Sequence, residues 1–120
     1  MKRVLLDENL DRRLKAYFSD KFEVVSVPDL GWQSKKNGEL LAAMAGEKFD
    51  YLLTADKNLR YQQNLAAFKI KVLILLVYDV RLTFLRHAVG EIERQVLEWD
   101  QADQYLEIDL RNFIVGEETE

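Results

Sequence analysis

Acidic and amide side chains recur directly after the apolar runs of this sequence. Two such clusters follow the runs at residues 3–6 and 51–54, and their members are Asp7, Glu8 and Asn9, and Asp56 and Asn58. A third pair, Asn37 and Glu39, lies at the start of a predicted helix. Several carboxylates at one place repel one another unless a cation or proton intervenes. A hard divalent cation such as Mg²⁺ or Mn²⁺ suits oxygen ligands and could activate water toward a phosphodiester.

The composition restricts the metal chemistry to oxygen ligands. The 120 residues include no cysteine, which excludes disulfides, thiolate metal sites and a cysteine nucleophile. The single histidine, His87, excludes a site built from several histidines. Mg²⁺ or Mn²⁺ is therefore the expected cofactor, with Asp7 and Asp56 as direct ligands and Glu39 as a third ligand or a group that orients water.

Helix capping is the competing explanation for each of these residues taken singly. Asp and Asn are favoured N-caps, and an acid in a first helical turn interacts well with the helix dipole. The set as a whole favours a site, because it falls at one predicted edge of the sheet. In that site the catalytic residues are Asp7, Glu39 and Asp56, and the supporting residues are Glu8, Asn9, Asn37 and Asn58.

Basic residues lie close in sequence to these acids. They are Arg12, Arg13, Lys35, Lys36, Lys57 and Arg60. Of these, Arg12, Lys36, Lys57 and Arg60 are the expected contacts to the phosphates of a polyanionic substrate. The net charge of −4 conceals a balance of +4 over residues 1–90 and −8 over residues 91–120. The charge therefore argues only against a strongly basic, non-specific binder of nucleic acid.

Apolar runs alternate with helical periodicity along the chain. The predicted strands are residues 3–6, 22–27, 51–54, 71–78 and 105–110, and the alternation in the last is compatible with an edge strand. The predicted helices are residues 9–19, 39–49 and 81–98, with a loop at 28–38 and a short helix or irregular turn at 57–68. This order predicts an α/β three-layer sandwich with a mostly parallel central sheet of four to five strands.

The length predicts one domain over residues 1–120, with a core at about 2–110 and an acidic tail at 111–120. No run approaches the roughly 20 apolar residues of a membrane span, and no signal peptide is present, so a cytoplasmic location is expected. Ligands of parallel α/β sheets bind beyond the carboxyl ends of the strands, which is where the acidic clusters are predicted to lie.

Three motifs resemble a bacterial family of small PIN-like domain proteins: LLDENL, GWQSKKNGELL and LLTADKNLRYQQNL. The resemblance covers about residues 2–78. It implies a metal-dependent ribonuclease, of the kind that often forms the toxin half of a toxin–antitoxin pair, with RNA as substrate and a small antitoxin protein as partner. By position it implies Asp7 as the first acid and Asp56 as the acid after the Thr-x-Asp strand end. The helix acid maps onto Asn37 or Glu39, of which only Glu39 is acidic, and Asp79 is a possible fourth acid.

Two other functions are compatible with the same residues. A phosphoacceptor receiver domain also has an acidic pair after its first strand and an aspartate after its third, here Asp7-Glu8 and Asp56. It would also need a Lys-Pro pair after strand five, and this sequence has no lysine after Lys71. A catalytically inactive PIN-like interaction module is the third possibility. Apolar positions on the helix at 81–98 further suggest a homodimer.

Overall fold

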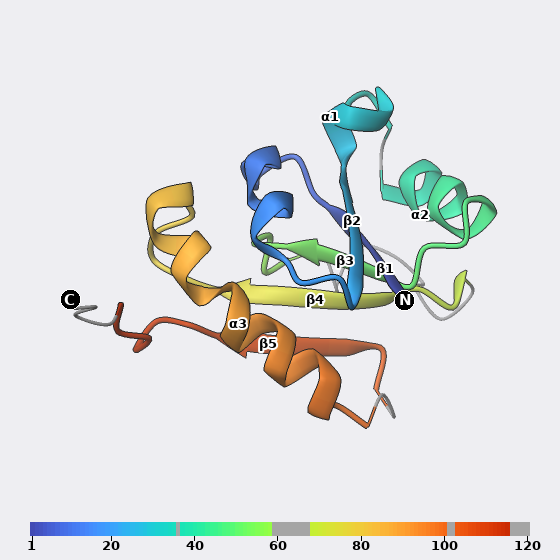
Figure 1. Cartoon of the computed structure of the whole chain (residues 1–120). Coiled ribbons are helices and arrows are strands. Elements are labelled where there is room, and N and C mark those ends of the chain that lie inside the picture. Colours follow the sequence, from blue (N-terminus) through green and yellow to red (C-terminus); the bar gives the residue numbers. More distant parts are fainter. Residues whose placement is uncertain (36, 59–67, 101–102, 116–120) are drawn as a thin grey trace.

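Five parallel strands form one sheet in the order β2-β1-β3-β4-β5 (Figure 1). The computed structural model describes residues 1–35, 37–58, 68–100 and 103–115. In chain order the elements are β1 (Lys2–Leu6), the 3₁₀ helix η1 (Arg12–Tyr17), β2 (Phe22–Ser26), α1 (Val27–Leu30), α2 (Asn37–Gly46), β3 (Tyr51–Thr54), β4 (Lys71–Leu76), α3 (Leu82–Glu98) and β5 (Tyr105–Asp109). The predicted α/β class and parallel sheet are confirmed, with five strands and β5 at an edge.

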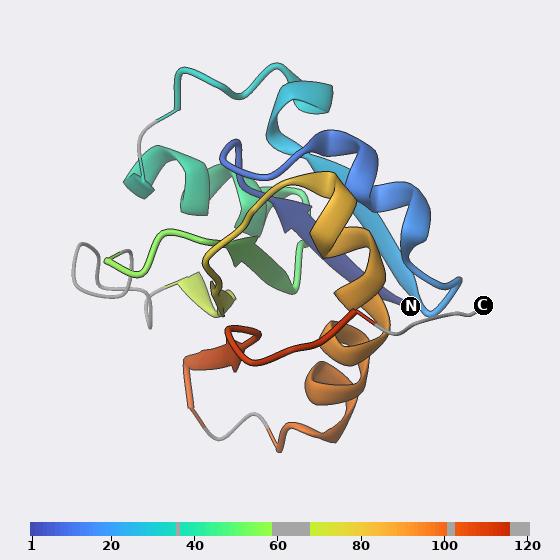
Figure 2. The same ribbon diagram turned by 90° about the vertical axis from the view of Figure 1, so that its left-hand side faces the viewer.

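Successive strand residues face opposite sides of the sheet, and both sides are buried. On one side Leu6, Leu53 and Leu73 pack with Leu85 and Ile92 of α3 and with the buried side chain of η1. The opposite side holds a second cluster, whose members include Leu5, Leu41, Met44, Leu52 and Val72. Figure 2 shows η1 and α3 over one face and α2 over the other. These layers leave the two ends of the strands as the surfaces where polar side chains gather.

The helix predicted over residues 9–19 is wrong in both type and extent. The segment forms η1, six residues of 3₁₀ helix over Arg12–Tyr17. Asp11 caps its start by accepting a hydrogen bond from the Arg13 backbone N–H at 2.9 Å, and the backbone is extended again at Phe18. Within η1 only Leu14 is buried. One buried side chain anchors this element, which is longer than the about three or four residues usual for a 3₁₀ helix.

The predicted loop at 28–38 contains helical residues at both ends. Strand β2 ends at Ser26, where a reciprocal capping box with Asp29 starts α1. Pro28 occupies the first turn, in which its missing N–H is not needed, and Gly31 ends α1 with φ of 70°. The loop prediction is therefore wrong for residues 28–30.

The remaining boundaries agree with the prediction to different degrees. The boundaries of β3 match, and α3 begins one residue later than predicted. Helix α2 begins at Asn37 and ends at Gly46, so it is shifted toward the N-terminus relative to the predicted 39–49. Most of the segment predicted as a short helix or turn at 57–68 lies outside the described residues. No helix among the described residues is long and apolar enough to cross a membrane.

Candidate functional site

Asp7 and Asp56 line one hollow of about 210 Å³ at the carboxyl edge of the sheet. Asp7 directly follows β1, and Asp56 lies two residues after β3, the strand paired with β1. Glu8 and Asn9 line the same hollow. We call it the carboxyl-edge hollow; Figure 2 looks onto this edge of the sheet. The structure thus brings together two of the three predicted catalytic acids and two of the four supporting residues.

The hydroxyl of Thr54 connects the two aspartates. It donates a hydrogen bond to Asp7 Oδ2 at 2.7 Å and accepts one from the Asp56 backbone N–H at 3.0 Å. The Thr54 hydroxyl oxygen also accepts a hydrogen bond from Asn9 Nδ2 at 3.4 Å. A hydroxyl has one donor and two acceptor sites, so all three are used. Thr54 is fully buried, which makes these bonds strong determinants of the geometry.

Local backbone hydrogen bonds fix the two carboxylates further. Asp7 Oδ1 accepts a bond from the Glu8 N–H at 2.9 Å, and Asp56 Oδ1 accepts one from the Asn58 N–H at 3.0 Å. The Asp7 backbone N–H donates to Leu53 O at 2.9 Å, which extends the pairing of β1 with β3 by one step. Each aspartate therefore has one carboxylate oxygen fixed by the adjacent backbone and belongs to a rigid strand end.

The rest of the lining of the hollow comes from the chain that runs from α1 into α2. Trp32, Gln33, Lys35 and Leu40 line it. The Trp32 ring packs edge-on against Phe49, with centroids 6.2 Å apart, and belongs to the buried cluster beneath α2. Lys35 Nζ lies 5.9 Å from the centre of the Trp32 ring. The hollow therefore combines three carboxylates, those of Asp7, Glu8 and Asp56, with a cation and an aromatic surface.

Thr54, Trp32 and Gln33 have no site role in the sequence-based prediction. For Thr54 the available signal is a hydroxyl residue at the end of an apolar strand, two positions before Asp56. For Trp32 the sequence alone is compatible with a ring exposed in the loop or packed in the core, because an aromatic residue after Gly31 suits either position. The structure gives both answers, because the half-buried ring packs on Phe49 and also lines the hollow.

Other predicted site residues lie apart from this hollow. Glu39, in the first turn of α2, is exposed and is not among the residues that line it. Lys57 and Asn58 are exposed, and Arg12 Nη1 lies 3.9 Å from Asp29 Oδ1. Lys36, Arg60 and the side chain of Asn37 lie outside the described part of the chain.

The described residues contain no group of three or more acidic or histidine side chains close enough together to hold a metal ion. Within them, the oxygen donors that share the carboxyl-edge hollow are Asp7, Glu8, Asn9 and Asp56. Mg²⁺ typically takes one or two carboxylates and keeps several waters, which substrate oxygens can replace. Asp7 and Asp56 fit that mode of binding, whereas a closed cage of protein ligands is not formed.

Asp79, the possible fourth acid, is held in an ion pair. Arg81 donates from Nε to Asp79 Oδ1 and from Nη2 to Oδ2, both at 3.0 Å. These hydrogen bonds, together with that from the Arg81 backbone N–H, lower the pKa of Asp79 below its usual range. The same two-residue spacing and paired geometry join Asp11 to Arg13 and Asp109 to Arg111. Asp79 thus belongs to a set of neutralised pairs rather than to the carboxyl-edge hollow.

In comparisons with known proteins, no family model, curated protein or solved structure matches this chain. The likeness to PIN-like proteins therefore stays a prediction from the three sequence motifs.

Proposed function

We propose that this protein is a Mg²⁺- or Mn²⁺-dependent endoribonuclease that hydrolyses phosphodiesters of single-stranded RNA. The observation that carries the proposal is the convergence of Asp7 and Asp56 on one hollow, joined through the Thr54 hydroxyl. Two oriented carboxylates at the carboxyl edge of a parallel sheet are suited to a hydrated divalent cation.

Asp7 and Asp56 would hold the cation. When bound, such an ion supplies Lewis-acid stabilisation of the negative charge that develops on a phosphodiester during hydrolysis. The chain's own residues then have separate tasks. Thr54 keeps Asp7 Oδ2 oriented, and Lys35 supplies a positive charge at the entrance for the anionic substrate.

The remaining assignments are part of the same proposal and rest on the sequence. Glu39 is assigned as a third ligand or a water-positioning base. Lys57 and Arg60 are assigned as phosphate contacts. The resemblance adds a toxin–antitoxin role in the cytoplasm, with a small antitoxin protein as partner.

The homodimer expectation loses most of its original support. The apolar positions on α3 that suggested it, including Leu85, Val89, Ile92 and Val96, are buried against the sheet. Among the described large apolar side chains of α3, only Leu97 is exposed. A dimer would therefore need another surface, which sedimentation of the purified protein would reveal.

The test is cleavage of a labelled single-stranded RNA with Mg²⁺ or Mn²⁺. Wild type should cleave, EDTA should abolish cleavage, and both Asp7→Asn and Asp56→Asn should be inactive. Asp79→Asn is a matched control, because that carboxylate lies at the same edge but pairs with Arg81. Intact RNA after incubation with wild type and either ion would refute the proposal, as would equal cleavage by all four proteins.

A phosphoacceptor domain is the second candidate, and the strand order favours it. The order β2-β1-β3-β4-β5 is one of the common doubly wound orders and occurs in phosphoacceptor proteins. The absence of a lysine after Lys71 removes a residue that such domains use after their fifth strand. Incubation with acetyl phosphate distinguishes the two, since a stable acyl phosphate on Asp56 would favour the phosphoacceptor. A protein that neither cleaves RNA nor accepts phosphate would be assigned as an interaction module.

A further inference from the structure

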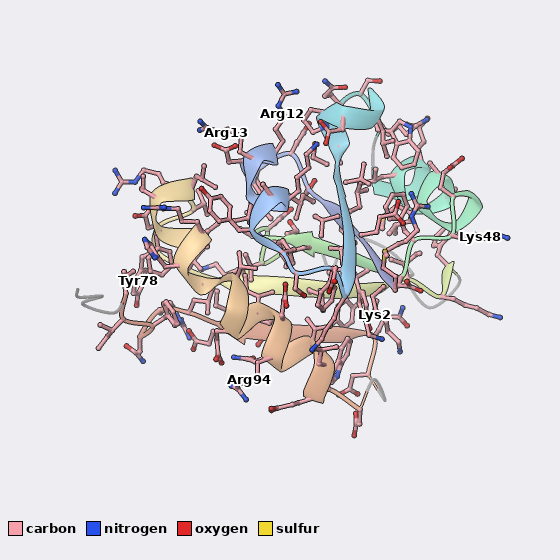
Figure 3. The ribbon with its side chains drawn as sticks, in the orientation of Figure 1. Lys2, Arg12, Arg13, Lys48, Tyr78 and Arg94 are labelled. Atoms are coloured by element: carbon pink, nitrogen blue, oxygen red, sulfur yellow. The ribbon has the colours of Figure 1, made fainter. Side chains whose placement is uncertain are left out.

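A second hollow, of about 610 Å³, lies at the amino edge of the sheet and shares no lining residue with the carboxyl-edge hollow. Four lysines line it. Lys2 is in β1, Lys21 lies just before β2, Lys69 lies two residues before β4, and Lys71 is the first residue of β4. We call it the amino-edge hollow. Figure 3 shows Lys2 near the start of β1, across the molecule from Arg13 and Tyr78. Parallel strands that begin together therefore gather lysines that are distant in sequence.

Three of the four lysines have no carboxylate partner in the part of the chain that the structure describes. Among the described residues, Lys2, Lys21 and Lys69 form no ion pair with a carboxylate, and Lys71 Nζ donates to the backbone carbonyl of Asp103 at 2.9 Å. Two acids, Asp20 and Asp50, also line the hollow. Even without Lys71, the ammonium groups that line the hollow outnumber its carboxylates by three to two, in a protein whose net charge is −4.

The walls of the hollow also include apolar surface. Leu97, which is 44% exposed, and the edge of Tyr51 contribute to the lining. Lys2 Nζ lies over the Tyr51 ring, 5.7 Å from its centre, so this lining ammonium group is next to an aromatic surface. A volume of this size falls in the range typical of sites for small molecules, about 300–1,000 Å³.

We propose that the amino-edge hollow binds a small ligand that carries two or more phosphate groups, of the nucleoside diphosphate class. Ammonium groups are compact point charges that bind phosphate oxygens well, and grouping several of them without carboxylate partners is unfavourable until an anion binds. The confinement of the lysines to one hollow selects a compact polyanion over a long strand. The apolar wall at Leu97 offers a surface for the non-phosphate part of the ligand.

The test is a titration of the purified full chain with metal-free ADP and with pyrophosphate, followed by backbone amide NMR and calorimetry. Both probes should shift the amides of Lys2, Lys21 and Lys71 and leave those of Asp7 and Asp56 unchanged. The double variant Lys21→Gln/Lys69→Gln should bind about tenfold or more weakly, because two charge-assisted contacts are lost. Both side chains are exposed, so the fold should persist.

Lys48→Gln is the matched control, since Lys48 is an exposed lysine outside the hollow and points away from the molecule in Figure 3. It should bind both probes within about twofold of wild type. Equal affinities of the double variant and the control would overturn the proposal, as would shifts confined to Asp7 and Asp56. A ten-nucleotide single-stranded RNA that displaces ADP and binds more tightly would overturn it in favour of a polynucleotide site.

Discussion

At the carboxyl edge of the sheet, charged side chains are fixed by hydrogen bonds, whereas at the amino edge several lysines have no carboxylate partner among the described residues. Asp7 and Asp56 are oriented through Thr54, and aspartate–arginine pairs occur after β1, after β4 and at the end of β5. Lys2, Lys21 and Lys69 have no comparable partner. Fixed carboxylates suit chemistry, because reaction geometry must be set in advance, and loosely held ammonium groups suit binding. The two edges are therefore expected to respond differently to the same kinds of change.

The largest expected effect is on RNA cleavage at the carboxyl edge. Asp7→Asn or Asp56→Asn should lower the cleavage rate by more than the about 10–100-fold that outer partners of metal ligands typically cost. The amino-edge variant Lys21→Gln/Lys69→Gln should cleave like wild type. Initial rates on a labelled RNA measure both. Loss of cleavage in the lysine variant would show that the amino edge is also needed for RNA cleavage, so the two edges would not be independent sites.

Removal of the Thr54 hydroxyl should produce the next largest effect. Thr54→Val leaves Asp7 Oδ2 and the Asp56 N–H without their partner, which should lower activity about 10–100-fold and stability by about 1–3 kcal/mol. Thr54→Ser retains the hydroxyl and should recover most of the activity. Urea unfolding and initial rates separate the two contributions. A fully active Thr54→Val protein would show that the bridge between the aspartates is not needed.

Divalent cations should stabilise the protein through the carboxyl edge only. At about ten times its dissociation constant, Mg²⁺ or Mn²⁺ should add about 1.4 kcal/mol to the free energy of unfolding. The melting temperature of wild type would rise by roughly 4–8 °C. The Asp7→Asn/Asp56→Asn protein should show no rise, and Lys21→Gln/Lys69→Gln should show the wild-type rise. An equal shift in all three proteins would place the cation elsewhere.

The smallest expected effect is a dependence of stability on acid pH. Hydrogen bonds from Arg13 lower the pKa of Asp11 to about 2, and those from Arg111 lower the pKa of Asp109 to about 2. Between pH 4 and 2 the unfolded chain therefore binds more protons than the folded protein, so stability falls as the pH falls. Because both pairs are exposed, the loss should be small.

Melting temperatures across this pH range check that expectation. Asp11→Asn/Asp109→Asn should flatten the acid slope relative to wild type. Lys21→Gln/Lys69→Gln removes no carboxylate, so it should keep the wild-type slope. A steeper slope in the asparagine variant would contradict the assigned sign.

The fold was predictable because its interior strands β3 and β4 are buried on both faces. The apolar runs within residues 71–78 and 51–54 indicate interior strands. Strand β3 has the predicted bounds, and β4 ends at Leu76, two residues before the predicted end. The region of η1 was not predictable, since Leu10, Leu14 and Phe18 recur at helical spacing while the chain forms only a short 3₁₀ helix. That outcome depends on how the segment packs against α3, which a local pattern does not contain.

The site was predictable as far as strand order allows. Asp7 and Asp56 follow strands that lie side by side, so the rule for strand ends brings them together. The position of Glu39 depends instead on where α2 packs. Its distance from Asp7 and Asp56 cannot be inferred from the spacing of these residues in the sequence. The paired state of Asp79 had a local signal, because the Asp-x-Arg pattern occurs at residues 11–13, 79–81 and 109–111 and forms the same contact each time.

The hydrogen bond between Thr54 and Asp7 joins residues 47 positions apart in the chain. Closing so long a loop lowers the entropy of the chain. This loss is offset only when β1 and β3 pair and the two apolar clusters form around them. The geometry of the aspartate pair is therefore a late product of folding. During synthesis, a chain that has emerged only as far as α2 holds Asp7 but neither Thr54 nor Asp56. An activity built on this pair would be absent from the growing polypeptide and would appear only with the paired strands.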